Sequence, residues 1–198
     1  MSNLNELLKQ KNIYGIEGHS QEVKEQTDFL KNIVNDESIK NVMEIGFNAG
    51  HSAELFLSSN KNIKLVSFDI GSHHYCEIGK QFIDNTYPNR HTLVIGDSLI
   101  SIPDYIERNT IKFDLIFIDG SHKYDTAKGD LLNCKKLAHD KTIVVMDDTV
   151  NNKDWRNDYH NGGPTKVWNE AKECNLVKEI GSIDFRYMRG QSWGYYKL

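Results

Sequence analysis

The feature that most constrains this chain is an apolar run that leads into two glycines four residues apart, Asn41-Val-Met-Glu-Ile-Gly-Phe-Asn-Ala-Gly-His-Ser52. The apolar run from Val42 to Ile45 is typical of a buried strand, and a helical pattern begins at Ser52. A strand, a tight glycine turn and a helix place free helix N–H groups against a ligand. The segment therefore predicts a ligand-binding turn at the end of the first strand.

The residues of this turn favour a ligand without a pyrophosphate. The dinucleotide fingerprint requires a second glycine two residues after the first, and this chain has Asn48 there. Glu44 at the strand end, followed by Gly46 and Gly50, instead suits a cofactor that carries a cationic amino group. The alternative is a strand, turn and helix in which the glycines are purely structural.

Composition limits the class of protein. A chain of 198 residues is most simply one domain, and 38% hydrophobic with 26% charged residues is typical of a globular protein. We expect a cytoplasmic protein without a membrane partner, because no apolar stretch is long enough for a membrane span or a signal core. Three widely spaced cysteines favour a reducing compartment. A net charge of −4 without a basic cluster argues against nucleic acid as a binding partner. The protein could form a homodimer.

Apolar runs alternate with helical patterns, which predicts an α/β fold with a Rossmann-like, doubly wound and mostly parallel sheet. The predicted strands are residues 41–46, 63–69, 91–96, 113–119 and 142–147, and the predicted helices are 52–59, 75–86, 98–108 and 125–138. Upstream, Ser20 is the expected N-cap of a further helix. The last two runs, 176–183 and 192–198, predict an antiparallel hairpin. We expect a single domain over residues 1–198, with an N-terminal helical cap at 1–38 and a Rossmann-like core at 39–198.

Every predicted parallel strand carries a carboxylate at or just past its carboxyl end, where ligands bind in open α/β sheets. Asp69 lies 25 residues after Glu44, about where a carboxylate binds ribose hydroxyls. Asp97 and Ser98 at the third strand end suit an adenine edge. Helix capping explains one or two such aspartates, but it explains five in a row poorly.

The adjacent pair Asp147 and Asp148 is the hardest to explain by capping, because two neighbouring carboxylates repel each other unless something neutralises them. If the fourth and fifth strands are neighbours, Asp119 converges on the same point. Three carboxylates without cysteine or clustered histidine suit a hard cation such as Mg²⁺. The alternative is a solvated acidic turn.

Two motifs then resemble a known family. Phe113-Asp-Leu-Ile-Phe-Ile-Asp-Gly-Ser-His-Lys-Tyr124 and Val144-Val-Met-Asp-Asp-Thr149 are similar to motifs of the metal-dependent O-methyltransferases, which belong to the class I S-adenosylmethionine-dependent methyltransferases. This group includes catechol-type and macrolide-sugar enzymes, and the resemblance covers about residues 17–198. Catechol-type enzymes have asparagine in place of Asp148 and a lysine base in place of His122. The sugar enzymes have aspartate at the position of Asp148, so the resemblance favours a sugar over a catechol as the acceptor substrate.

The resemblance implies S-adenosylmethionine as cofactor and Mg²⁺, or another divalent cation, held by Asp119, Asp147 and Asp148. It implies that His122 is the catalytic base, although Asp119 could share that role and His122 could be an exposed residue at a helix start. The expected cofactor-binding residues are Glu44, Gly46, Asn48, Gly50, Ser52, Asp69, Asp97, Ser98 and Asp119.

The polar and aromatic segment from Thr149 to Pro164 follows the acidic pair directly and predicts a lid in which Trp155 and Tyr159 cover the acceptor. Its glycines 162 and 163 predict a hinge and the start of a helix. The alternative is an ordinary surface loop. Specificity is expected from this lid and from residues 14–20. The predicted function is Mg²⁺-dependent O-methylation of a small molecule, sugar or glycoconjugate. A metal-independent methyltransferase and a non-catalytic cofactor-binding subunit are the alternatives.

Overall fold

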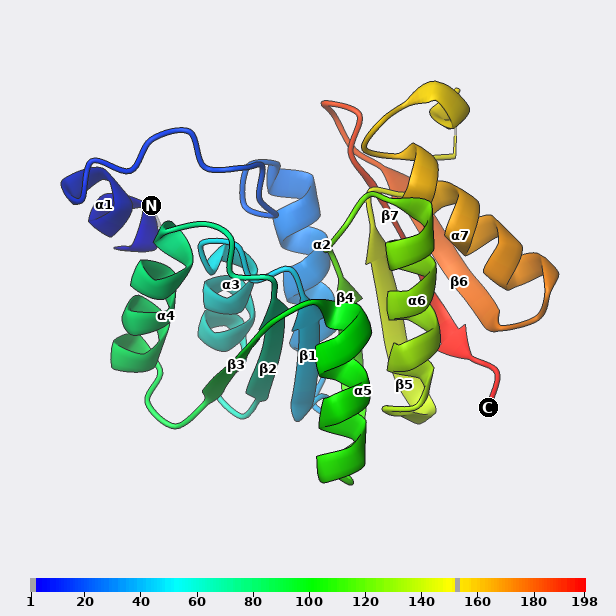
Figure 1. The fold of residues 1–198 in the computed structure, drawn as a ribbon, viewed down its shortest axis with the longest axis horizontal. Coiled ribbons are helices and arrows are strands. Elements are labelled where there is room, and N and C mark those ends of the chain that lie inside the picture. The colour runs from blue at the N-terminus through cyan, green and yellow to red at the C-terminus, as the bar shows by residue number, and fades with distance from the viewer. Residues whose placement is uncertain (1–2, 152–153) are drawn as a thin grey trace.

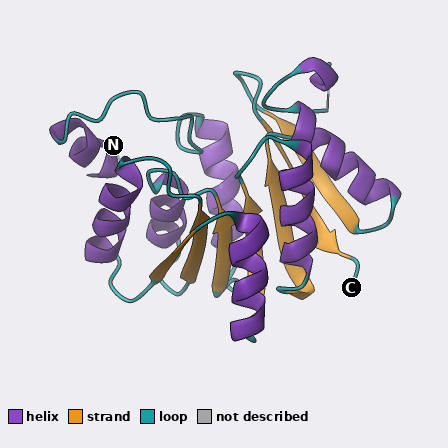
Figure 2. Cartoon of the chain, in the orientation of Figure 1, coloured by secondary structure: helices purple, strands orange, loops and turns teal. Residues whose placement is uncertain are grey.

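The computed structural model describes residues 3–151 and 154–198, and Figures 1 and 2 show a sheet with helices on both faces. The strands of this sheet are β1 (Asn41–Ile45), β2 (Lys64–Asp69), β3 (His91–Ile95), β4 (Phe113–Ile118), β5 (Ala138–Asp147), β6 (Val177–Asp184) and β7 (Gly190–Tyr196). The helices are α1 (Asn3–Gln10), α2 (Lys24–Val34), α3 (His51–Ser59), α4 (Tyr75–Thr86), α5 (Ser98–Arg108), α6 (Tyr124–Lys135) and α7 (Gly162–Glu173), with a short 3-10 helix η1 (Trp155–Asn157).

The strand order β3-β2-β1-β4-β5-β7-β6 confirms the predicted topology. Strands β1 to β5 pair in parallel, and β7 enters antiparallel between β5 and β6. The chain builds outward from β1 to β3 and then returns to the other side of β1 with β4. This reversal is the topological switch point of the sheet, at which open α/β folds bind their ligands.

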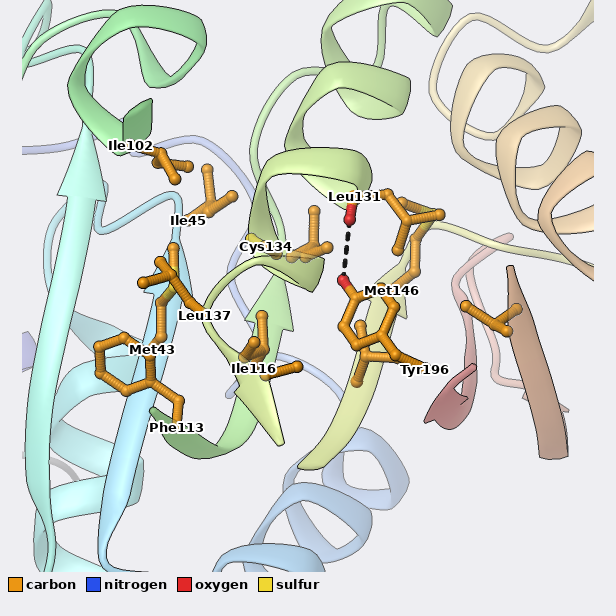
Figure 3. Packing of buried hydrophobic residues seen from close by; sticks show 14 of the residues in the cluster. Met43, Ile45, Ile102, Phe113, Ile116, Leu131, Cys134, Leu137, Met146 and Tyr196 are labelled. Atoms are coloured by element: carbon orange, nitrogen blue, oxygen red, sulfur yellow. Dashed lines mark hydrogen bonds between the residues drawn. The ribbon is translucent and has the colours of Figure 1, made fainter. Parts of the chain in front are cut away.

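Hydrophobic cores fill both faces of the sheet because successive strand residues point to opposite sides. Met43 and Ile45 face the helices α5, α6 and α7, and Figure 3 shows the packing on this side. Val42 faces the opposite core, to which α2, α3 and α4 contribute. The almost continuous apolar sequence of β4 follows from burial on both faces, as a doubly wound sheet requires.

Most element ends lie within two residues of the sequence prediction, and two boundaries differ more clearly. Ser20 is not the N-cap of α2: the helix begins at Lys24 after Val23, and the buried Ser20 contributes its carbonyl to the Thr27 hydroxyl at 3.0 Å. Strand β5 begins at Ala138, where helix was predicted. Thr142 stabilises this earlier start, because its hydroxyl accepts from the His139 N–H at 2.8 Å and donates to the Phe113 carbonyl at 2.6 Å.

The N-terminal segment reaches the carboxyl edge of the sheet. Leu4 and Leu8 of α1 pack with Tyr75 of α4 and with Ala49 in the glycine turn. From α1 the chain runs along the upper edge in Figure 1 before it enters α2. None of the helices in the described part of the chain is long and apolar enough to cross a membrane.

Helix α4 lies so close to the glycine turn that only glycine fits at position 79. A Cβ there would lie 2.0 Å from the Ala49 carbonyl oxygen. Alanine normally stabilises a helix interior by about 1 kcal/mol relative to glycine. We expect Gly79→Ala to destabilise the fold instead, by about 1–3 kcal/mol, because backbone must move. Gly129→Ala in α6 is the control, since it meets only the end of the Leu99 side chain. Urea denaturation that showed equal effects of both substitutions would contradict this account.

Candidate functional site

The glycine turn after β1 brings the ends of β1 and β4 into close approach. Gly46 has φ +96°, and a Cβ on it would lie 1.8 Å from the carbonyl oxygen of Asp119. Gly50 has φ +94° and immediately precedes α3, and Asn48 between them also has a positive φ. Asparagine tolerates this left-handed conformation better than most residues. The turn therefore needs its particular residues for conformation as well as for an approaching ligand.

Asp69 holds this turn from the neighbouring strand. One of its carboxylate oxygens accepts from the Asn48 N–H at 2.8 Å, and the other accepts from the Gly71 N–H at 2.7 Å. Each oxygen keeps a second lone pair, and the side chain is half-buried at the surface. The predicted place of Asp69 beside the turn is thus compatible with a ligand hydroxyl.

Glu44 and Ser52 lie beneath the turn, where both side chains are buried. The Ser67 hydroxyl donates to one oxygen of Glu44 at 2.5 Å and lies 2.8 Å from the His91 Nε2 atom. The other oxygen of Glu44 makes no hydrogen bond of good geometry to any described residue, although Ser52 lies near enough to lower the pKa of the carboxyl. Burial raises the pKa of Glu44 to about 7. Both residues were predicted to bind the cofactor, and their position shows that they first support the turn from inside.

The third strand end combines polar and apolar groups. Asp97 caps α5 by accepting a hydrogen bond from the Leu99 N–H at 2.9 Å, and Ser98 is the first residue of the helix. Helix capping therefore explains at least part of why an aspartate stands at this position. Ile70, Ile95 and Ile100 are all more than half exposed around the ends of β2 and β3. Exposed aliphatic side chains at the ligand-binding edge provide apolar walls for a flat ring. Sequence analysis missed these isoleucines.

The acidic residues predicted to share a site do converge. One ligand oxygen from each of Asp119, Asp147 and Asp148 lies within 4.8 Å of the others. They line one small hollow together with His122 and Pro164. Burial and the neighbouring carboxylates raise the pKa of Asp119 well above its ordinary value, and the same causes raise that of Asp147 to about 7. This mutual repulsion is the property that a divalent cation would relieve, so the donor set fits such an ion.

Three polar residues from outside the predicted motifs surround this cluster. The Gln26 amide nitrogen lies 3.1 Å from both oxygens of Asp147. Gln191 stands opposite Asp147 in the β5–β7 pair and is fully buried. Neither of its amide atoms makes a hydrogen bond of good geometry to a described residue, but the amide lies near enough to Asp147 to lower the pKa of that carboxyl. Arg189 lowers the pKa of both Asp119 and Asp147 by its positive charge. A glutamine on the apolar stripe of α2 is the one sequence signal that could have pointed to Gln26.

His122 lies beside the acidic cluster. Its Nε2 atom is 2.8 Å from Asp148, and this hydrogen bond raises its pKa. Its Nδ1 atom is 3.2 Å from the Nδ1 atom of His160, which sequence analysis did not single out. The structure therefore places an imidazole at the edge of the cluster and a second one behind it.

The predicted lid segment reaches the same histidine. The ring of Tyr159 packs edge-on to His122 with centroids 6.3 Å apart, and Tyr159 is 74% exposed. Trp155 lies in η1, away from any described contact with the cluster, and residues 152–153 of the segment lie outside the described residues. The predicted helix start is confirmed, because α7 begins at Gly162. Gly163 allows the close approach of this helix to the His122 carbonyl, and its role as a hinge stays a prediction.

Comparison with known proteins identifies the family. A family model described as a methyltransferase domain matches residues 43–149, more than half of the chain, so the chain belongs to this family. No curated protein sequence matches it. Together with the strand order and the terminal antiparallel hairpin, the match defines a class I methyltransferase, an enzyme that transfers methyl groups from S-adenosylmethionine. This favours the enzyme over the non-catalytic subunit that the sequence left open.

Several solved structures share the fold. An O-methyltransferase from Bacillus cereus in complex with S-adenosylhomocysteine has a TM-score of 0.76 at 18% identity, over 100% of this chain and 91% of that chain. TomG from Streptomyces achromogenes, an O-methyltransferase of tomaymycin synthesis in complex with S-adenosylmethionine, has a TM-score of 0.74 at 15% identity, over 99% and 88%. The N-methyltransferase NodS from Bradyrhizobium japonicum has a TM-score of 0.65 at 15% identity, over 88% and 96%.

The buried Glu44 has a consequence for the pH dependence of stability. The unfolded chain loses this proton near pH 4.5 and the folded chain near pH 7, so the free energy of unfolding falls as the pH rises between these values. We expect Glu44→Gln to abolish this pH dependence. The free energy of unfolding of the variant, relative to that of the wild type, should therefore increase by about 3 kcal/mol as the pH rises from 4.5 to 7. Urea denaturation at several pH values measures it. The exposed Glu107→Gln is the control, and parallel curves for wild type and Glu44→Gln would refute the assignment.

Proposed function

We propose that the chain is a divalent-cation-dependent O-methyltransferase that uses S-adenosylmethionine to methylate a hydroxyl of a small molecule, sugar or glycoconjugate. The observation that carries the proposal is the convergence of Asp119, Asp147 and Asp148, with oxygens within 4.8 Å of one another. An acidic cluster alone is weak support. The fully buried amide of Gln191 next to Asp147, which makes no hydrogen bond of good geometry to any described residue, is a second feature that suits a polar ligand at this position.

The charges around the cluster suit a divalent ion. Three ionised carboxylates carry a charge of −3, and the Arg189 guanidinium, which is itself paired with Glu22, offsets only part of it. Asp119, Asp147 and Asp148 would hold the ion, and carboxylate oxygens are the ligands that Mg²⁺ prefers. The ion supplies Lewis acidity that stabilises negative charge on an acceptor oxygen.

The residues of the chain supply the remaining functions. The glycine turn with Asp69 and the isoleucines of the third strand end bind and orient the cofactor, since they line the carboxyl edge. His122 removes the acceptor proton. Its Nε2 atom lies 2.8 Å from Asp148 on the side of the cluster, and its Nδ1 atom lies 3.2 Å from His160, so Nε2 is the ring atom that faces an acceptor at the cluster. Asp119 is the alternative base.

Exposed aromatic residues favour an acceptor with a flat apolar face. Tyr14, Tyr159 and Tyr187 are each more than 70% exposed. They belong to the N-terminal segment, the 149–164 segment and the β6–β7 hairpin tip, which all lie along the upper edge in Figure 1. Tyrosine rings pack against sugar faces and aromatic rings and still present a hydroxyl to water. These rings favour a sugar or glycoconjugate as the acceptor.

Arg189 also favours a second candidate. Its charge already lowers the pKa of Asp119 and Asp147, so it offsets part of the repulsion within the cluster without an ion. A metal-independent methyltransferase is the function that this observation supports, and the N-methyltransferase NodS has a similar fold.

Removal of one carboxylate separates these candidates. We expect Asp147→Asn to weaken Mn²⁺ binding by at least about tenfold and to abolish S-adenosylhomocysteine formation with a panel of hydroxylated acceptors. S-adenosylmethionine affinity, measured by calorimetry, should stay near that of the wild type. Chelation of the wild-type enzyme should stop turnover and Mg²⁺ should restore it. Full turnover in excess chelator would establish the metal-independent candidate instead.

The base is tested at His122. We expect His122→Ala to lower turnover by about 10²- to 10⁴-fold, the usual contribution of a general base, without a change in cofactor affinity. His160→Ala is the matched control, because it removes the neighbouring imidazole and leaves the His122 contact with Asp148. Near-normal turnover of the His122 variant in a fixed-time product assay would show that Asp119 or solvent, and not His122, removes the acceptor proton.

A further inference from the structure

We propose that Gln26 and Arg189 are positioning residues for Asp147: the Gln26 amide fixes the orientation of the carboxylate, and Arg189 fixes the orientation of the amide. The inference rests on the proposed cation site and concerns residues outside the region 43–149 that the family model matches. It makes α2 and the β6–β7 hairpin parts of the site.

The first contact joins α2 to the end of β5. Gln26 is fully buried, and its amide nitrogen lies 3.1 Å from each oxygen of Asp147, although 121 residues separate the two in sequence. Gln26 occupies the apolar face of α2 between the buried Val23 and Leu30. Packing alone would favour an aliphatic residue there, because a buried amide costs free energy unless both its polar atoms have partners. Gln26 has such partners.

The second contact sets the direction of the amide. The Arg189 guanidinium reaches the Gln26 side-chain oxygen at 3.5 Å, the outer limit of a hydrogen bond. A guanidinium can only donate, so the oxygen of the amide must face Arg189 and the NH₂ group must face Asp147. The reversed amide would place oxygen against carboxylate and NH₂ against guanidinium. Arg189 therefore selects the one orientation in which Gln26 donates to Asp147.

Arg189 is itself held in place by two contacts with the segment that precedes α2. It donates to the Glu22 carboxylate at 2.8 Å and to the His19 carbonyl at 3.2 Å, and both residues precede α2. Its neighbour Arg186 forms an ion pair with Glu25 of α2. These contacts tie the hairpin tip to the start of α2. The chain of hydrogen bonds runs from this junction through Gln26 to Asp147.

A positioning role predicts an effect on cation affinity that a purely structural role does not. Groups that orient metal ligands typically contribute about 10- to 100-fold to metal affinity. We expect Gln26→Met, which keeps length and burial but removes the donor, to raise the Kd for Mn²⁺ by that factor, measured by electron paramagnetic resonance. S-adenosylmethionine affinity should stay unchanged. Gln21→Met is the matched control, because the Gln21 amide binds the His51 carbonyl instead of the cluster.

Arg189→Lys tests the second link, because it keeps the charge but loses the planar fork. It should weaken Mn²⁺ binding in the wild type and have no further effect in the Gln26→Met background, since both act through one amide. Additive effects would overturn the role of Arg189.

Wild-type Mn²⁺ affinity in a Gln26→Met protein that binds cofactor normally would overturn the role of Gln26. If Gln26→Met fails to fold, Gln26→Asn, which shortens the side chain, replaces it under the same criteria. A wild-type protein that binds cofactor but no Mn²⁺ would instead refute the proposed function, and this inference with it.

Discussion

Electrostatic repulsion among three carboxylates at one edge of the sheet is the constraint on which the site depends. Asp119, Asp147 and Asp148 lie close enough that burial and mutual charge raise the pKa of two of them. Folding must therefore supply compensating groups at the same place. The Arg189 charge and the Gln26 amide do so within the chain, and both come from elements that are distant in sequence. The acidic cluster and its polar surroundings form one unit.

The topology explains why these groups meet. Strands β1 and β4 are neighbours at the switch point, and the glycine turn after β1 approaches the Asp119 carbonyl so closely that Gly46 can carry no side chain. The glycine turn and the acidic cluster are thus in direct contact through Asp119. The antiparallel entry of β7 next to β5 then brings Gln191 opposite Asp147 and Arg189 close behind it. A purely parallel sheet would leave this side of the cluster without the hairpin.

Local patterns predicted most of the fold and the acidic cluster, because the strands follow from apolar runs and the cluster follows from carboxylates at the ends of neighbouring strands. Apolar runs gave the parallel strands, and a carboxylate at each strand end pointed to the shared edge. The failures have a different cause. Ser20 resembles an N-cap but is buried, and β5 extends back to Ala138 because Thr142 bridges two backbones. His160 and Arg189 could not be assigned from local sequence, and only its polar position on an apolar helix face pointed to Gln26, since each of the three acts through a contact with a residue far along the chain.

This division between local and distant contributions bears on how such a site diversifies. The region that matches the family model contains the glycine turn and all three carboxylates, whereas Gln26 and Arg189 lie outside it. The exposed tyrosines at positions 14, 159 and 187 also lie outside that region. The part of the chain that matches the methyltransferase model and the groups proposed to orient the cluster are thus encoded in different parts of the chain. Under the proposed function, changes in the N-terminal segment or the β6–β7 hairpin would alter both the acceptor contacts and the geometry of Asp147, because Arg189 joins these two segments through His19 and Gln26.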